Sequence, residues 1–177
     1  MKLRNLKREP IRQNRQIAVL LTMPDGAAGI AFTLRQMAYI ARQYRCNPDM
    51  RRFAEDLIRN TESKNALAEA RAIFLFVRDN IRYTQDVRDT ETLKTPDATL
   101  YSGMGDCDDM SLLVSTLLES VGYTTRFVAV GTIDAAAFDH VYCEVQILGN
   151  WIALETTEYW PMGQAPSPVF CELIVNV

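Results

Sequence analysis

The strongest constraint on the fold is a change in the spacing of apolar residues at Gly122. Before this residue, apolar side chains recur every three or four positions, most clearly along residues 110–118, which is the period of a buried helix. After it, the pattern changes to period two along residues 125–131 and 140–147, as in strands. Helices that precede strands predict an α+β fold, with the helices packed on an antiparallel sheet.

Three further helices are expected before residue 83. Apolar spacings of three and four predict helices over residues 30–44, 53–58 and 67–80. The third follows Thr61, whose hydroxyl is expected to cap it. Residues 83–106 are polar and rich in turn formers, so they are predicted to form a loop.

The strands after residue 125 are expected to form an antiparallel meander. Residues 149–150, Gly-Asn, are a turn signal, and residues 151–155 read as a third strand. Three prolines and a glycine in residues 161–168 predict a loop, and residues 169–177 are predicted to form a last strand.

The charge of the chain is unevenly distributed. Residues 1–15 carry six Lys or Arg against Glu9, a net charge of +5, so the remainder carries −8 within a total of −3. This basic arm is either a solvated terminus or a docking segment for a protein or, less favoured, a nucleic acid. The apolar run of residues 17–23 is too short for a membrane span or a signal peptide. We expect a strand or arm there, and no membrane partner.

The four cysteines are widely spaced and contain no CxxC pair, which argues against a disulfide framework and favours a reducing, cytoplasmic location. His140 and Cys143 are predicted to lie on opposite faces of a strand, which disfavours a zinc site. Residues 106–109 lack the spacing and the glycine of a calcium loop. We therefore expect neither a metal nor a cofactor.

Cys107 lies at the predicted start of the buried helix. Free backbone N–H groups and the helix dipole favour an anion there, and so favour a thiolate. Asp106 is placed to be the N-cap, and Asp109 to complete a capping box. The negative charges of Asp106, Asp108 and Asp109 act in the opposite direction and would raise the pKa of the thiol.

His140 is the only histidine in the chain, and Glu155 ends the following predicted strand. A carboxylate next to an imidazole can hold its tautomer and stabilise the imidazolium. Counted outward from the turn, the two residues are offset, so their contact is expected to need a bulge or a shifted register. The simpler alternatives are a small apolar Cys107 at a helix start and a His140 that serves only the fold.

Four segments together resemble the motifs of the transglutaminase-like superfamily, in the same order and spacing. They are residues 105–109 (GDCDD), 122–128 (GYTTRFV), 139–145 (DHVYCEV) and 151–157 (WIALETT). Residues 76–83 resemble the helix end that precedes the nucleophile in these domains, so that the likeness covers roughly residues 65–160. The segments at 95–100 and 161–163 resemble small members of the superfamily encoded by bacteriophages and prophages.

The resemblance implies a papain-like core with a triad of Cys107 as nucleophile, His140 as base and Glu155 as the third member. It further implies a thioester that water resolves by peptide or amide hydrolysis, with amine transfer as a variant. The oxyanion would be held by the Cys107 backbone N–H and an upstream donor, for which Tyr101 is the nearest polar candidate. Asp106 and Trp151 are weaker candidates for contacts with substrate.

The sequence departs from the family at the third triad position, which is usually Asp or Asn. Glu155 adds a methylene, so the distance to the imidazole must be absorbed elsewhere. The competing hypothesis is a structural or assembly protein, virion-associated, that keeps the fold with little turnover. We divide the chain into a basic arm or strand (1–26), a helical N-terminal region (27–64) and a transglutaminase-like catalytic core (65–177).

Overall fold

The computed structural model describes residues 18–20, 26–85 and 92–177. The basic residues 1–15 lie outside the described part of the chain, so their docking role stays a prediction. In residues 17–23, the structure describes one short strand, β1 (Ala18–Leu20), in agreement with the expected strand or arm.

Five helices are present in the described residues, including the three expected early ones. Their bounds are α1 (Gly26–Tyr44), α2 (Pro48–Ile58), α3 (Ala66–Asn80), α4 (Pro96–Ser102) and α5 (Cys107–Ser120). The predicted cap of the third helix was wrong. Asn65 caps α3 by accepting from the Ala68 N–H, whereas the Thr61 hydroxyl donates to the Ile58 carbonyl at the end of α2. Thr61 lies too far before the first turn of α3 to reach its N–H groups.

Helix α5 is the centre of the molecule and begins at Cys107, as its sequence predicts. Its N-terminus carries a complete capping box: the Asp106 side chain accepts from the Asp109 N–H, and the Asp109 side chain accepts from the Asp106 N–H. Every residue from Asp109 to Leu118 is buried. A helix that is buried on nearly all sides is surrounded by other elements, and this burial fixes the position of its first turn.

The main sheet has four antiparallel strands in the order β7-β6-β5-β8. Their bounds are β5 (Thr125–Gly131), β6 (His140–Ile147), β7 (Asn150–Leu154) and β8 (Cys171–Asn176). The predicted meander corresponds to β5, β6 and β7, and the predicted last strand pairs with the free edge of β5.

The prediction of a loop over residues 83–106 was wrong for the described residues 92–105, most of which lie in a helix or in strands. This region contains α4 and three short strands: β2 (Arg82–Tyr83), β3 (Thr92–Lys94) and β4 (Met104–Gly105). Strand β3 pairs with β1, and β2 pairs in parallel with β4. Strands of two or three residues are too short to show a period, so the sequence pattern could not reveal them.

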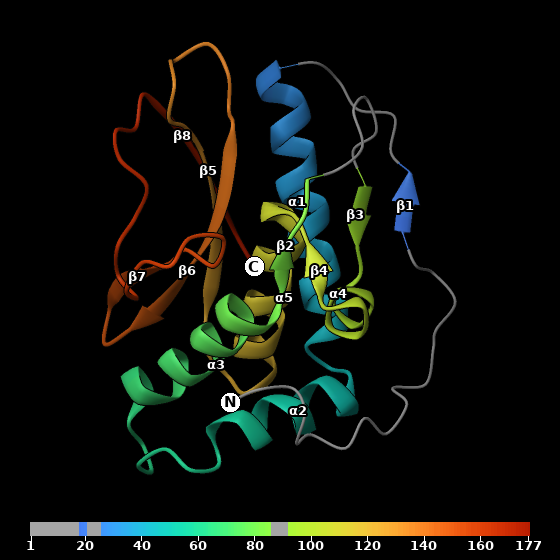
Figure 1. The fold of residues 1–177 in the computed structure, drawn as a ribbon, viewed down its shortest axis with the longest axis vertical. Helices are drawn as coiled ribbons and strands as arrows, with labels where there is room; N and C mark the ends of the chain where they lie inside the picture. The colour runs from blue at the N-terminus through green and yellow to red at the C-terminus, as the bar shows by residue number, and fades with distance from the viewer. Residues whose placement is uncertain (1–17, 21–25, 86–91) are drawn as a thin grey trace.

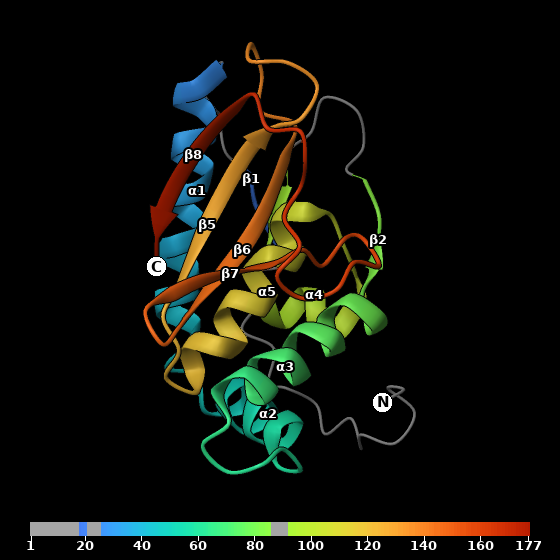
Figure 2. The ribbon, with the colours of Figure 1, turned by 90° about the vertical axis from the view of Figure 1, so that its left-hand side faces the viewer.

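The helices form a layer against one face of the sheet. Figure 2 shows α1 and α5 behind the sheet, and Figure 1 shows α2 and α3 closing its lower end. One buried cluster joins α2, α3 and α5 to β6 and β7, and a second joins α1 and α5 to β5 and β6. The helices of residues 27–64 therefore bury their apolar faces against the same α5 that carries Cys107.

No helix in the described ranges is long and apolar enough to cross a membrane. The four cysteines are all unbridged thiols.

Candidate active site

The Cys107 side chain lies at the start of α5, facing the beginning of β6. The thiol donates to Asp108 Oδ1 at 3.6 Å, and the backbone N–H of Val141 donates to the sulfur. One turn further along α5, the Ser111 hydroxyl donates to the Val141 carbonyl at 3.2 Å. Both polar groups of the Val141 backbone are thus bound by α5, which fixes Cys107 against the residue that follows His140.

The environment of the thiol favours its protonated form. Burial raises the pKa of Cys107 well above its ordinary value, and the charges of Asp108 and Asp106 raise it further. The hydrogen bond from the Val141 N–H lowers the pKa, but by less than burial or either charge raises it, and the hydrogen bond to Asp108 raises it slightly more. Of the opposing effects expected from the sequence, the structure shows that burial and the acidic neighbours raise the pKa of the thiol.

His140 and Glu155 form a short, direct pair. His140 Nε2 lies 2.5 Å from Glu155 Oε2. The other carboxylate oxygen accepts from the Thr157 N–H at 2.8 Å and from its hydroxyl at 2.6 Å. With only 1% of Glu155 exposed, these three donors satisfy a carboxylate that water does not reach.

The pair forms without a bulge or a shifted register, so that expectation was wrong. Strand β7 pairs with β6 in a regular ladder that ends at Cys143 and Leu154. One step further, this register sets Glu155 opposite Tyr142, so His140 is its diagonal neighbour two residues along β6. Diagonal neighbours are within reach of long side chains. The additional methylene of glutamate covers this offset.

The two groups shift one another's pKa in opposite directions. Burial lowers the pKa of His140, but the hydrogen bond and charge of Glu155, with the charges of Asp108 and Asp139, raise it above the ordinary value. Burial raises the pKa of Glu155, but the contacts with His140 and Thr157 hold it below the ordinary value. Each group therefore stabilises the charged form of the other.

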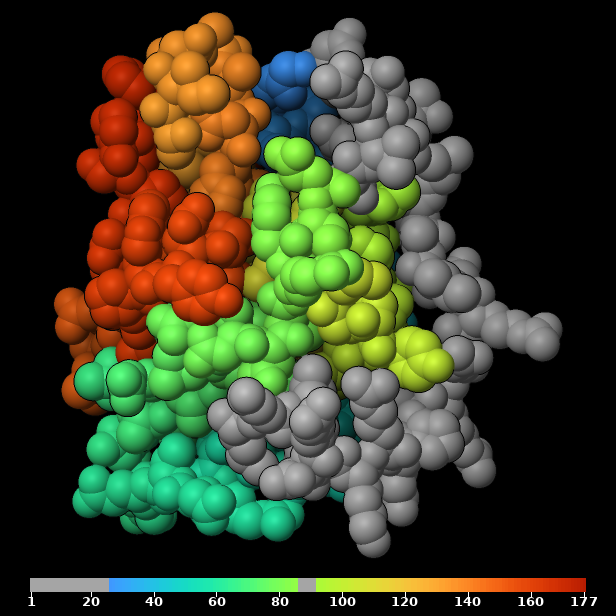
Figure 3. Space-filling model, in the orientation of Figure 1, coloured from blue at the N-terminus to red at the C-terminus, as the bar shows by residue number. Residues whose placement is uncertain are grey.

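Because Nε2 is bound to Glu155, Nδ1 is the ring nitrogen that remains for another partner. No hydrogen bond between Cys107 and the imidazole is present in the described residues, where the thiol donates to Asp108. The Asp108 charge raises the pKa of both Cys107 and His140, so all three side chains share one region. In Figure 3 the orange segment before β6, the red-orange segment after β7 and the green segment of β2 meet on one face.

The three weaker candidates for contacts with substrate do not all lie near Cys107 and His140. Asp106 is part of the capping box, one residue before Cys107. Tyr101 is 71% exposed near the end of α4. Trp151 lies toward the opposite end of β7 from Glu155, under the Arg126 guanidinium at 4.3 Å from the ring centre. The structure therefore brings Cys107, Asp106, His140 and Glu155 together and leaves Trp151 outside the group.

Sequence reasoning missed Tyr83 as a neighbour of the thiol. Tyr83 on β2 pairs with Gly105 on β4, two residues before Cys107. Burial raises the pKa of Tyr83, and the charges of Cys107, Asp106 and Asp108 raise it further. The residue stands at the end of the motif over residues 76–83, but its partner strand is too short to be recognised from the sequence.

Among the described residues, no group of three or more His, Cys, Asp or Glu side chains is arranged to hold a metal ion.

Residues 51–156 match the family model of the transglutaminase-like superfamily, so the chain belongs to that superfamily. Among solved structures, it resembles a "putative cysteine protease" from Cytophaga hutchinsonii (TM-score 0.55, 19% identity, 73% of this chain and 43% of that one). It also resembles a "putative protease" from Parabacteroides distasonis (TM-score 0.51, 17% identity, 69% of this chain and 26% of that one). These likenesses show a shared papain-like, transglutaminase-type α+β fold.

The chain spans less than half the length of the first of these proteins and about a quarter of the second. No curated protein matches the sequence significantly.

Proposed function

We propose that this protein is a thiol-dependent acyl-transfer enzyme that hydrolyses peptide or amide bonds. Cys107 is the nucleophile, His140 the general base and Glu155 the carboxylate that orients His140. Membership of the transglutaminase-like superfamily supports this class of chemistry, as does the fold shared with proteins described as putative proteases.

The observation that carries the proposal is the His140–Glu155 contact of 2.5 Å beside the element that holds Cys107. The carboxylate is itself held in place by two donors from Thr157, so it offers Nε2 a fixed acceptor. Because Nε2 is hydrogen-bonded to Glu155, the tautomer and the orientation of the ring are set, as in a nucleophile–base–carboxylate triad. Nδ1 is then the nitrogen that takes the thiol proton.

In the proposed reaction, the neutral imidazole of His140 takes the Cys107 proton at Nδ1 as the sulfur attacks the substrate carbonyl carbon. The resulting oxyanion is stabilised by the backbone N–H of Cys107 and a further donor. When the carbon–nitrogen bond breaks, the imidazolium gives its proton to the leaving amine. Water then attacks the thioester, His140 takes one of its protons, and that proton returns to the sulfur as the carbon–sulfur bond breaks.

A second candidate function is a structural or assembly protein with little turnover, of which a virion component is one form. The observation that favours it is the raised pKa of the Cys107 thiol, whose hydrogen bond goes to Asp108 rather than to the imidazole. A protonated thiol in acidic surroundings is a poor nucleophile. Under the enzyme proposal, the imidazole must therefore remove the proton as substrate binds.

Iodoacetamide labelling, read separately for each cysteine by peptide mass spectrometry, tests the proposal between pH 5 and 10. We expect Cys107 to label faster than the exposed Cys46 near neutral pH in the wild-type protein. The advantage should disappear in His140→Ala and persist in Gln146→Ala, a matched change at an exposed residue on the same strand. Labelling of Cys107 no faster than Cys46 or Cys171, with or without His140, would favour the assembly protein.

Hydrolysis and amine transfer share the acylation step and differ in what resolves the thioester. A quenched fluorescent peptide library, incubated with and without a biotinylated primary amine, separates them. We expect cleavage with new peptide termini. Incorporation of the biotinylated amine into glutamine-containing peptides, without cleavage, would reverse this assignment and leave the Cys107 thioester in place.

A further inference from the structure

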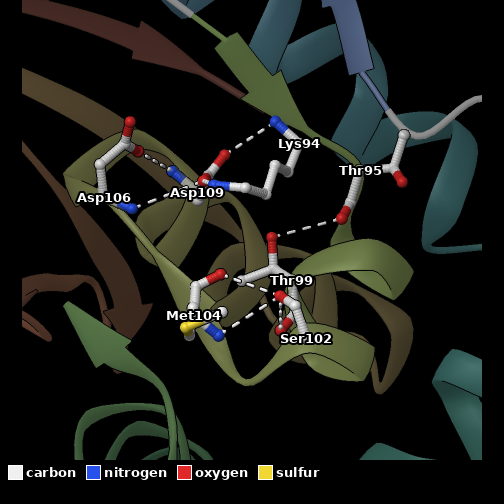
Figure 4. A network of polar contacts seen from close by, with 7 residues as sticks. All are labelled: Lys94, Thr95, Thr99, Ser102, Met104, Asp106 and Asp109. Atoms are coloured by element: carbon white, nitrogen blue, oxygen red, sulfur yellow. Dashed lines mark hydrogen bonds and ion pairs between the residues drawn. The ribbon is translucent and has the colours of Figure 1, made fainter. Parts of the chain in front are cut away.

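The side chain of Asp109 stands at the junction of three elements directly behind the nucleophile. It is fully buried, with 0% exposure, on the first turn of α5. Its Oδ1 accepts from the Lys94 backbone N–H at 2.7 Å, and its Oδ2 accepts from the Lys94 ammonium at 2.6 Å. Oδ2 also accepts from the Asp106 N–H at 3.4 Å. Figure 4 shows both Lys94 and Asp106 bonded to this one carboxylate.

These contacts close the segment of residues 94–106 into a loop. Lys94 begins the segment and Asp106 ends it, so Asp109 joins its two ends. Within the segment, the Thr99 hydroxyl donates to the Thr95 carbonyl, and the Ser102 hydroxyl bonds both polar backbone groups of Met104. Internal hydrogen bonds therefore stabilise the segment, and the carboxylate of Asp109 connects both ends of the segment to α5.

Gly105 packs tightly against the Asp109 side chain. A Cβ added at Gly105 would lie 2.7 Å from the Asp109 Cβ and 3.2 Å from its Oδ2. The first distance is shorter than real Cβ contacts allow, so the Gly105 backbone packs closely against the Asp109 side chain. A displacement of Asp109 toward Gly105 would therefore move the backbone just before Cys107.

The charge of this carboxylate depends on Lys94. Burial raises the pKa of Asp109, and the largest opposing effects are the hydrogen bonds and the charge of Lys94. A buried carboxylate without its cation tends to take up a proton or to move toward water. A protonated Asp109 would lose acceptor capacity at Oδ2, the oxygen that serves both Asp106 and the ammonium.

We propose that Lys94 is a positioning residue for the nucleophile: by pairing with buried Asp109, its ammonium holds the backbone of residues 105–107 in the place that sets the Cys107 sulfur against β6. Lys94 acts through Asp109 and does not touch substrate. This inference rests on the proposed function only for its chemical consequence, since the positioning itself can be measured without turnover.

Two measurements on Lys94→Met test the proposal, with Lys94→Arg as the conservative variant and Lys64→Met as the matched control. Lys64 is exposed and precedes α3, so its replacement removes a lysine charge remote from Asp109. The first measurement is amide hydrogen exchange of the peptide over residues 103–110. We expect faster exchange in Lys94→Met, near wild-type exchange in Lys94→Arg, and no change in Lys64→Met.

The second measurement is the pH profile of Cys107 alkylation, with His140→Ala in the same series. Misplacement of a reacting group by about 1 Å can cost up to about 10²-fold in rate. We expect Lys94→Met to label Cys107 at least about tenfold more slowly near neutral pH, Lys94→Arg to stay within about threefold, and Cys46 to be unchanged.

Unchanged amide exchange over residues 103–110 in a folded Lys94→Met protein overturns the proposal. If Cys107 labelling in the wild-type protein depends on His140, an unchanged Cys107 alkylation profile in Lys94→Met also overturns it. A third outcome is faster exchange in Lys94→Met together with Cys107 labelling that is equally fast in the wild-type protein and in His140→Ala. It supports the positioning role and counts against the proposed function.

If Lys94→Met does not fold, Lys94→Met/Asp109→Asn removes the uncompensated charge. In this variant one oxygen of residue 109 becomes an NH2 group, so the side chain can no longer accept from both the Lys94 and the Asp106 backbone N–H groups. The same faster exchange and slower labelling are therefore expected. Wild-type behaviour of that variant would also overturn the proposal.

Discussion

The two halves of the candidate active site are prepared to different degrees. On the sheet, His140 and Glu155 are joined at 2.5 Å, and their mutual effects raise the pKa of one and lower that of the other. At the helix start, Cys107 donates to Asp108, and burial with two acidic neighbours raises its pKa. The imidazole and the carboxylate are therefore already paired, whereas the surroundings of the thiol favour its protonated form.

This difference indicates where control of the reaction lies. A helix N-terminus stabilises a thiolate by well under the energy that burial and adjacent carboxylates can cost it. Activation of Cys107 must then come from the imidazole, or from substrate that displaces the Asp108 hydrogen bond. Substitutions on the sheet half should remove reactivity, and substitutions of the acidic neighbours should increase it.

The largest effect is expected for His140→Ala. Loss of the general base should lower the rate of Cys107 alkylation at neutral pH, and of any peptide cleavage, by about 10²–10⁴-fold. The rate is measured by stopped labelling and mass spectrometry, with Gln146→Ala as the control on the same strand. A loss below threefold would mean that the two halves do not cooperate.

Glu155 offers a sharper test because its length matters as well as its charge. Glu155→Asp restores the residue usual in the family but shortens the side chain across the diagonal offset. We expect about a 10²-fold loss in reactivity at Cys107, comparable to that of Glu155→Gln, which keeps the length and loses the charge. Full activity of Glu155→Asp would show that the backbone adjusts and that the offset is not limiting.

Substitution of an acidic residue beside Cys107 should increase the alkylation rate of the thiol, in contrast to the substitutions at His140 and Glu155. Asp108→Asn removes a charge that raises the pKa of Cys107, so the thiolate should form at lower pH. We expect alkylation of Cys107 near pH 7 to rise by roughly three- to tenfold, in line with a shift of up to about one pKa unit. The same series is measured on Asp134→Asn, an exposed acidic residue on the loop before β6. No increase in Asp108→Asn would mean that desolvation alone holds the thiol protonated.

The smallest effect is a pH dependence of stability. The pKa of His140 is raised above its ordinary value of 6.5, so its contribution is complete below pH 6.5 and is lost as pH rises through the folded value. The pKa of Glu155 is lowered below 4.5, so its contribution is complete above pH 4.5 and is lost as pH falls through the folded value. The pair should therefore stabilise the fold most between these two values.

We expect the melting temperature of the wild-type protein to exceed that of Glu155→Gln by the widest margin in this window. Each kcal/mol corresponds to roughly 2–4 °C for a chain of this size. Differential scanning calorimetry from pH 3 to 9 checks the profile. Glu55→Gln, which breaks the exposed pair with Arg51, should give a small, flat difference across the same range.

Much of the fold was accessible from the sequence because its longer elements are periodic. The apolar spacing of residues 110–118 and the alternation along 125–131 and 140–147 identified α5, β5 and β6. The capping box at Asp106 was also visible, because it depends on residues three apart. The region 83–106 was misread, since its strands have two or three residues and take their hydrogen bonds from distant parts of the chain.

The chemical candidates could be named from the amino-acid sequence: the only histidine, the cysteine at a helix start, and the carboxylate that ends the next predicted strand. The folded chain was needed to show that His140 uses Nε2 for Glu155 across a diagonal of a regular ladder, and that Asp109 takes Lys94 as its cation. Periodicity and capping act within a few residues, whereas the distances and pKa values at a site depend on register, burial and neighbours that are remote along the chain.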